Sequence, residues 1–161
     1  MTGKTHLMGG VAACVALANV TSYDPAILTA AGAAGSLLPD ICHGGSKIGR
    51  KFPILSKMIN ILFGHRTFTH SLLFLVIVGV LLSLFVPIRA VQVGVLIGMI
   101  SHLILDVATK NGIKLLYPSK MTVRFPFTTK TGGVVEYIVL TGLTLIVIYL
   151  GQDVVANYLY G

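Results

Sequence analysis

The sequence predicts an all-α, polytopic membrane protein with about five transmembrane helices and two cytoplasmic interfacial loops. Hydrophobic residues make up 55% of the 161 residues and charged residues only 11%, whereas about 25% of an ordinary soluble domain is charged. The mean hydropathy is +0.88. A soluble chain of this length needs more charge to cover its surface. The composition therefore excludes a soluble domain, a disordered chain, a collagen-like fibre and a nucleic-acid-binding tail.

Five apolar segments form the predicted bundle. Residues 71–88, 90–108 and 134–150 are long enough to cross a bilayer readily, which takes roughly 20 apolar residues. Residues 6–20 and 26–39 are shorter and rich in Ala and Gly. Small side chains let helices approach closely, so we expect these two segments to pair as a hairpin. Residues 1–161 are predicted to form a single integral membrane domain.

Basic residues predict the orientation. If all five segments span the membrane, 11 of the 12 Lys and Arg residues lie on one side and only Arg89 lies on the other. The side with more basic residues is the cytoplasm. We therefore expect an integral membrane protein with a cytoplasmic N-terminus, two cytoplasmic loops and an external C-terminus. This arrangement explains the net charge of +7 without an acidic partner.

The first 20 residues also fit a second interpretation. Lys4, an apolar run and the sequence Ala16-Leu17-Ala18 imitate a secretory signal peptide with an A-x-A cleavage site. Cleavage would remove one span together with His6. Sequencing the N-terminus of the purified protein distinguishes the two interpretations.

The two cytoplasmic loops have different patterns. Residues 51–63 place their apolar side chains on one helical face, which predicts an amphipathic helix lying among lipid headgroups. These side chains are Leu55, Met58, Ile59 and Leu62. Residues 113–127 mix aromatic with basic side chains and contain two prolines, so we expect an irregular interfacial segment.

The ionisable residues follow a pattern that solubility does not explain. All five histidines and three of the five acids fall at the predicted cytoplasmic ends of the spans. An ionisable group in an apolar segment is costly unless it is paired or bound to an ion. We therefore predict that they meet in one site. The residues are His6, Asp40, His43, His65, His70, His102, Asp106 and Glu136.

Their spacing favours a metal site. His102 and Asp106 are four residues apart and share a helix face, and Asp40 and His43 are three apart. Imidazole and carboxylate ligands suit Zn²⁺, with Mn²⁺ or Fe²⁺ as alternatives. One or two ions are expected, with Asp106 or Asp40 able to bridge two. The predicted ligands are His6, Asp40, His43, His65, His70, His102 and Asp106.

Neighbouring residues suit an anionic substrate. A bound metal acidifies water and polarises a phosphoryl oxygen. Arg66 can hold phosphate with two hydrogen bonds, or can serve only as a positive-inside anchor. Glu136 can orient a histidine, or can be an anion at a helix N-terminus. The predicted catalytic residues are Arg66, Asp106 and Asp40, and the predicted substrate or supporting contacts are Arg66, Thr67, Ser71, Lys110 and Glu136.

Four motifs resemble those of one family. They are Thr5-His6 with Gly9-Gly10, the G-S-L-L-P-D sequence of residues 35–40, the H-R-x-x-T-H-S block of residues 65–71, and the S-H-x-x-x-D block of residues 101–106. Over residues 2–118 the chain resembles the YdjM-like family of bacterial and archaeal membrane proteins. The resemblance implies membrane-bound, metal-dependent hydrolases, grouped distantly with zinc-dependent phospholipase C and P1 nuclease.

That relationship implies an all-helical zinc site for phosphodiester cleavage. This chain is shorter than the soluble zinc enzymes and has fewer ligands, so one or two ions are expected rather than three. Thr67 stands where the family has glycine, outside the proposed ligands.

The predicted function is metal-dependent hydrolysis of an ester at the cytoplasmic membrane face, with a phosphoester of a membrane lipid as substrate. No nucleic-acid partner is expected, and a protein partner or a homo-oligomer stays open. Two other classes are a metal or proton transporter and a scaffold or regulatory protein with a structural metal. Against transport, the candidate ligands gather at one face of the membrane.

Overall fold

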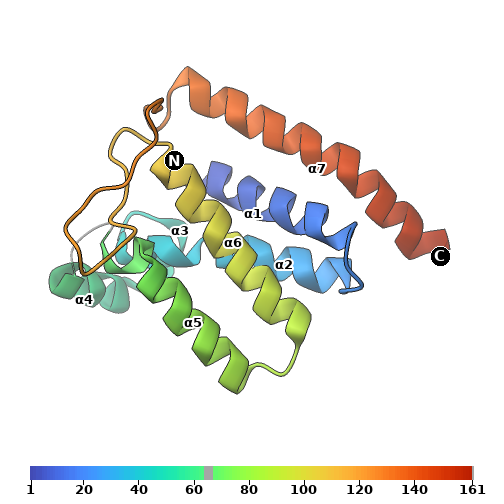
Figure 1. The fold of residues 1–161 in the computed structure, drawn as a ribbon, viewed down its shortest axis with the longest axis horizontal. Helices are drawn as coiled ribbons and strands as arrows, with labels where there is room; N and C mark the ends of the chain where they lie inside the picture. The colour runs from blue at the N-terminus through green and yellow to red at the C-terminus, as the bar shows by residue number, and fades with distance from the viewer. Residues whose placement is uncertain (64–66, 161) are drawn as a thin grey trace.

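The computed structural model describes residues 1–63 and 67–160, and their side chains except those of residues 47, 63 and 157–160. In the described part of the chain, five longer helices form the bundle (Figure 1). They are α1 (Gly3–Ala18), α2 (Pro25–Gly35), α5 (Leu72–Phe85), α6 (Arg89–Val107) and α7 (Val134–Tyr160). Two short helices and two 3-10 turns lie between α2 and α5: η1 (Leu38–Cys42), α3 (Lys47–Lys51), α4 (Pro53–Phe63) and η2 (Phe68–His70).

The all-α membrane fold predicted from the sequence is confirmed. Among the described residues, three segments are long and apolar enough to cross a bilayer, judged by length and composition: Pro25–Cys42, Arg89–Val107 and Val134–Ala156. The apolar helix Leu72–Phe85 is shorter. Between the described residues the only strand-like pairings are isolated bridges, Thr109 with Thr129 and Ile113 with Val123.

Some predicted boundaries move for local reasons. The segment predicted to end at residue 88 is helical only to Phe85, because residues before a proline disfavour the helical conformation and Pro87 follows. The segment predicted to end at residue 39 leaves the α-helix at Gly35 and continues as the 3-10 turn η1. The last helix runs ten residues beyond its predicted end at residue 150, to Tyr160.

Glycine residues allow α1, α2 and α6 to pack so closely that their backbones are in contact. A Cβ atom added at Gly98 of α6 would lie 2.1 Å from the carbonyl oxygen of Gly32 in α2. One added at Gly10 of α1 would lie 2.7 Å from the same oxygen. Such contacts hold helices together where lipid removes the hydrophobic driving force. The pairing of α1 with α2 agrees with the hairpin predicted from their Ala and Gly content.

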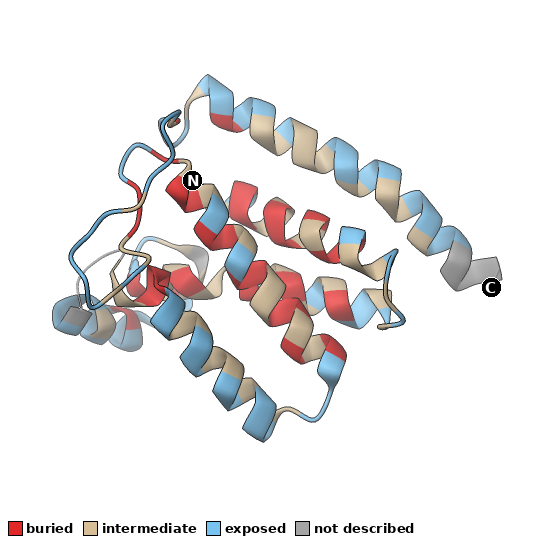
Figure 2. Ribbon diagram, in the orientation of Figure 1, coloured by how far each residue is buried: buried red, intermediate tan, exposed pale blue. Residues whose placement is uncertain are grey.

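The two other long helices lie on the outside of this group (Figure 2). No residue of α5 is buried, and only 6% of the apolar window of α7 is buried, against 56% for α6. Large apolar side chains therefore point outward, where a bilayer would surround them. On α7 they include Ile138, Leu145 and Tyr149.

One end of the bundle gathers the connecting segments (Figure 1). The helices α1, α5 and α7 begin there, α2 and α6 end there, and α3, α4 and residues 108–133 cover it. We call it the loop end. Leu72 donates its backbone N–H to Leu115 at 2.9 Å, and Phe125 donates to Val107 at 3.0 Å. Residues 108–133 are thus tied across the ends of α5 and α6, with the irregular backbone that the prolines predicted.

The predicted amphipathic helix forms as α4. Polar residues contact the rest of the protein: Ser56 is 1% exposed, and the Asn60 side chain donates to the Cys42 carbonyl at 3.2 Å. Its apolar side chains face outward, with Ile54 85% and Ile61 73% exposed. This polarity is the reverse of a soluble surface helix and suits contact with lipid.

A buried histidine and carboxylate cluster as a candidate metal centre

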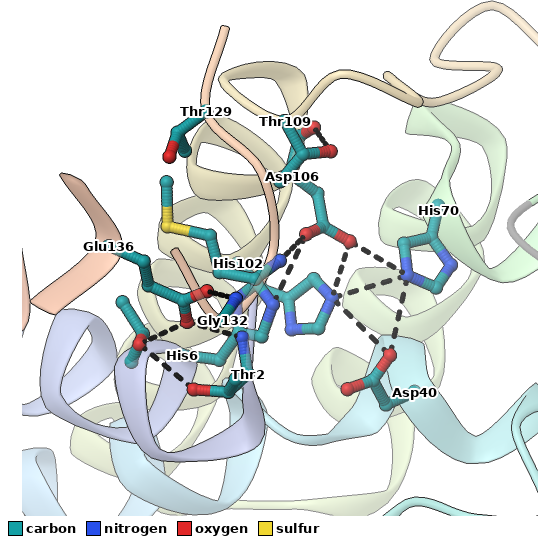
Figure 3. A network of polar contacts seen from close by, with 12 residues as sticks. Thr2, His6, Asp40, His70, His102, Asp106, Thr109, Thr129, Gly132 and Glu136 are labelled. Carbon is teal, nitrogen blue, oxygen red and sulfur yellow. Dashed lines mark hydrogen bonds and ion pairs between the residues drawn. The ribbon is translucent and has the colours of Figure 1, made fainter. Parts of the chain in front are cut away.

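Five ionisable side chains meet inside the loop end (Figure 3). They come from four elements: His6 from α1, Asp40 from η1, His70 from η2, and His102 and Asp106 from α6. The side chains of the three histidines and Asp106 are 0% exposed, and that of Asp40 is 15% exposed. The fold therefore gathers residues spread over a hundred positions into one nearly closed cluster.

The position of His6 depends on how α7 holds the start of α1. One oxygen of Glu136, Oε1, accepts hydrogen bonds from the Thr2 backbone N–H at 2.5 Å and from the Thr5 hydroxyl at 2.6 Å. The other oxygen, Oε2, accepts from the Gly132 N–H at 2.7 Å. Glu136 is therefore an anion at the N-terminal turn of α1. It fixes the first turn of α1, which carries His6.

The position of His70 depends on hydroxyl groups on either side of it. Ser71 caps α5 by accepting from the Phe74 N–H at 3.2 Å and donates to the Phe68 carbonyl at 2.6 Å. The Thr69 hydroxyl lies 3.1 Å from Nδ1 of His70. These contacts turn Nε2 of His70 toward the cluster. Ser71 therefore supports the site from outside it, and Thr69 is a contact that sequence reasoning missed.

A backbone carbonyl sets the tautomer of His102. Nδ1 of His102 lies 2.7 Å from the carbonyl oxygen of Ser36. A carbonyl only accepts, so Nδ1 carries the proton and the neutral ring has its lone pair on Nε2. A histidine metal ligand is commonly oriented in this way by its second nitrogen. The ring of His6 stacks on this ring at a centroid distance of 3.7 Å.

Three ligand atoms form a compact triangle (Figure 3). Nε2 of His70 and Nε2 of His102 are 3.2 Å apart, and they lie 3.4 Å and 3.5 Å from Oδ2 of Asp106. Ligands bound at about 2.0–2.2 Å to a tetrahedral ion are about 3.3–3.6 Å from one another. The triangle therefore has the size of one face of a tetrahedral zinc site.

Asp40 lies across the two histidines from Asp106. Its Oδ1 is 3.6 Å from Nε2 of His70 and 3.9 Å from Nε2 of His102. A second group that fits an ion consists of His6, Asp40 and His102. Since His102 offers one free nitrogen, the two groups share a ligand, and the triangle with Asp106 is the tighter of them.

Asp106 presents its two oxygens to different partners. Oδ2 faces His70 and His102, whereas Oδ1 lies 3.2 Å from Nε2 of His6 and contacts the backbone nitrogen of Met1. Among the described residues, Nδ1 of His6 is buried without a hydrogen-bond partner. Asp106 thus presents one oxygen to each side of the cluster, and its role as a bridge between two ions stays a prediction.

The cluster needs positive charge at its centre. The carboxylates of Asp106, which is fully buried, and of Asp40, which is 15% exposed, face imidazole nitrogens, and buried charge is costly unless it is compensated. Burial disfavours the charged form of His70, but its hydrogen bonds with Asp106 and Asp40 outweigh burial and raise the pKa of His70 to about 10. The N-terminal ammonium group of Met1 forms an ion pair with Oδ1 of Asp106, and either a proton or a metal ion can supply positive charge beside Oδ2.

Three other predicted site residues in the described part of the chain, His43, Thr67 and Lys110, lie outside the cluster. His43 is exposed and lies outside both groups of ligand atoms, because the chain leaves η1 at Cys42 and turns away. Thr67 is half-buried at the start of η2, and Lys110 is exposed in the segment after α6. His65 and Arg66 lie outside the described residues. The proposed roles of these residues stay predictions.

The sequence comparison places the chain in a family. The profile described as YdjM inner membrane protein matches residues 1–159. The chain belongs to the YdjM inner membrane protein family. This confirms the family resemblance drawn from the motifs, together with the membrane location. The family description names a location and no reaction.

Proteins from different bacteria are similar to this chain over most of its length. The protein YvsG of Bacillus subtilis (strain 168) is 58% identical over 145 residues, which cover 90% of this chain and 91% of YvsG. Inner membrane protein YdjM of Escherichia coli (strain K12) is 33% identical over 146 residues, which cover 83% of this chain and 74% of that protein. No solved structure matches the chain.

Proposed function

We propose that this YdjM family member is a metal-dependent hydrolase that cleaves a phosphoester of a membrane lipid. One observation carries the proposal, namely the triangle formed by Nε2 of His70, Nε2 of His102 and Oδ2 of Asp106, with edges of 3.2 Å, 3.4 Å and 3.5 Å. A catalytic zinc site commonly has three protein ligands and one open position. Three converging ligand atoms match that pattern.

The donor set favours zinc, with Mn²⁺ or Fe²⁺ as alternatives, and the bridging position of Asp106 leaves room for a second ion beside His6. A bound divalent ion would acidify a water molecule and polarise a phosphoryl oxygen. His70, His102 and Asp106 would hold the ion. The Ser36 carbonyl would keep the proton of His102 on Nδ1, so that Nε2 stays available.

Asp40 is suited to move the proton. It is the one cluster side chain with measurable exposure, 15%, and its Oδ1 lies next to both histidine nitrogens. In hydrolysis a water oxygen bonds to phosphorus and the bond from phosphorus to the alcohol oxygen breaks. An Asp40 oxygen would take the water proton and return it to the leaving alcohol. Arg66, which the sequence suggests as a phosphate contact, lies outside the described residues, and its role stays a prediction.

We place the site at the cytoplasmic face, with the N-terminus inside and the C-terminus outside. The basic residues support this orientation: the segments of the loop end carry them, whereas Arg89 begins α6 at the opposite end. A lipid headgroup would then lie at the depth of the cluster. Attaching a reporter of periplasmic location after Tyr160 and at Thr2 checks the orientation.

Elemental analysis of the detergent-purified protein tests the metal site. The wild type is expected to contain one or two zinc ions per chain, and His102→Ala is expected to lose at least one. Asp153→Asn, which changes an exposed carboxylate of α7 outside the cluster, is the control and keeps the wild-type metal content. Phosphate release from mixed lipid vesicles should fall with the metal. Equal metal content in wild type and His102→Ala would remove the proposal.

A structural metal is the second candidate, because four of the five cluster side chains are 0% exposed. In that case a chelator lowers the unfolding temperature, and no phosphoester is cleaved at any metal content. The basic loops would then bind a protein or an anionic lipid. Transport has less support, since the five side chains gather at one end of the bundle. Metal flux into proteoliposomes would favour it.

A further inference from the structure

The cluster opens to the surface through Asp40. This carboxylate lines a cavity of about 460 Å³ between the start of α1, the η1–α3 segment and the start of α7. Pockets for small ligands commonly measure about 300–1,000 Å³. A molecule that reaches the cluster from this cavity meets Asp40 first, because the other four side chains are 0% exposed.

Lys4 from the first turn of α1 and Arg50 from α3 line this cavity, and the imidazole of His43 lies in its wall as well. Within the described part of the chain, neither Lys4 nor Arg50 forms an ion pair with a carboxylate. Glu136 also lines the cavity, but both of its carboxylate oxygens already accept hydrogen bonds from Thr2, Thr5 and Gly132. A metal ion bound in the neighbouring triangle would offset the negative charge of Asp40. Two cationic groups are thus available for an anion.

The cavity also has an apolar wall that continues onto the lipid-facing side of the bundle. Leu37, Tyr137 and Leu140 line it, and Tyr137 is 64% exposed on α7. α7 buries little of its surface against the rest of the chain. A ligand with a charged end and an apolar tail could place the tail along α7 while its charged end stays in the cavity.

We propose that this cavity binds the headgroup of an anionic phospholipid, with Lys4 and Arg50 holding the phosphate and the acyl chains lying along α7. The inference rests on the proposed function, for which it supplies the substrate class and the binding residues. The shared chemistry is a phosphate group, and the apolar wall selects the lipid over free phosphate as its source.

Calorimetry with a short-chain lipid tests the proposal. The full-length protein in detergent, with zinc added, is titrated with dioctanoyl phosphatidic acid. The double variant Lys4→Gln, Arg50→Gln is expected to bind at least about tenfold more weakly, because it loses both cationic hydrogen-bond donors to the phosphate. Lys51→Gln changes an exposed lysine of the same helix outside the cavity and is expected to bind as the wild type does. The single variants apply if the double variant does not fold.

Two further probes identify the source of the phosphate. Inorganic phosphate and dioctanoylglycerol are both expected to bind at least about tenfold more weakly than the phosphatidic acid, because each lacks one half of the recognised ligand. Inorganic phosphate that binds as tightly as the lipid would overturn the lipid assignment. Dioctanoylglycerol that binds as tightly would overturn the anion site. An equal loss in Lys51→Gln would overturn the location.

The cavity proposal and the proposed function fail in different measurements. If lipid binding does not respond to Lys4 and Arg50 while His102→Ala still loses zinc, the cavity assignment is wrong and the hydrolase proposal stands. If the wild type holds no metal while the double variant loses lipid binding, the hydrolase proposal is wrong and the lipid site stands.

Discussion

The helices α6 and α7 have similar mean hydropathies, but α6 is largely buried in the protein and α7 is largely exposed on its outside. Their mean hydropathies are 1.9 and 2.1, yet 56% of α6 is buried and only 6% of the α7 window. α6 carries Gly94, Gly98, His102 and Asp106 at intervals of four residues, so small and ionisable side chains share one face. α7 presents bulky apolar side chains outward. In a membrane protein, small and polar residues therefore indicate the face that contacts protein, and bulky apolar residues the face that contacts lipid.

The largest expected effect concerns the glycine face of α6. Gly98→Ala places a Cβ atom 2.1 Å from the Gly32 carbonyl oxygen, and rigid backbone cannot move aside as a side chain does. We expect a loss of stability of about 3 kcal/mol or more, measured as a lower thermal unfolding temperature in detergent.

Gly142→Ala in α7 is the matched control, since nothing lies within 4 Å of a Cβ added there. Alanine favours a helix over glycine by roughly 0.5–1 kcal/mol, so this variant should be neutral or slightly more stable. If both variants lost the same stability, the distinction between a protein-facing α6 and a lipid-facing α7 would be wrong.

The next effect concerns Glu136 of α7, which holds the first turn of α1 beside the cluster. Glu136→Gln removes the charge that accepts hydrogen bonds from Thr2, Thr5 and Gly132, and the amide offers a single acceptor in place of two. We expect a loss of about 2 kcal/mol and faster hydrogen exchange in the first turn of α1. Asp153→Asn, an exposed acid on the same helix, should stay within about 0.5 kcal/mol of the wild type.

The sequence predicts the cluster well where helix geometry alone decides it. His102 and Asp106 share a face because they are four residues apart in a regular helix, and the alternating direction of the spans brings His6, Asp40 and His70 to the same end. His43 shows the limit of this reasoning. A spacing of three residues places it with Asp40 only if the helix continues, but the backbone at His43 is extended.

Other features of the site depend on contacts between distant segments. The Ser36 carbonyl orients His102 across 66 residues, and Glu136 meets Thr2 across 134. Neither contact has a spacing pattern that sequence could reveal. The cavity beside Asp40 likewise arises from three elements that meet only in the folded chain, so no spacing pattern in the sequence points to Lys4 and Arg50.

A smaller effect is expected where a hydroxyl only orients a ligand. Thr69→Val removes the hydroxyl that lies 3.1 Å from Nδ1 of His70, while the ring keeps its place in the cluster. Outer partners of this kind contribute about 10–100-fold to metal affinity, and we expect about tenfold weaker zinc binding in a competition titration with a chelator. Thr144→Val on α7 removes a hydroxyl that bonds only its own helix and should leave zinc affinity unchanged. Equal affinities in the two variants would mean that Thr69 does not position the ligand.

The smallest expected effect is the truncation of an apolar side chain on α7. Leu145 is 60% exposed and Leu103 of α6 is 5% exposed, so the same change to alanine removes lipid contact in one and protein packing in the other. Leu103→Ala should cost about 2–3 kcal/mol, whereas Leu145→Ala should cost no more than about 0.5 kcal/mol, both measured by thermal unfolding in the same detergent. A loss at Leu145 as large as that at Leu103 would show that protein covers this face of α7. Cross-linking from a cysteine at position 145 would then identify the neighbour, and a second copy of the chain would give a symmetric product.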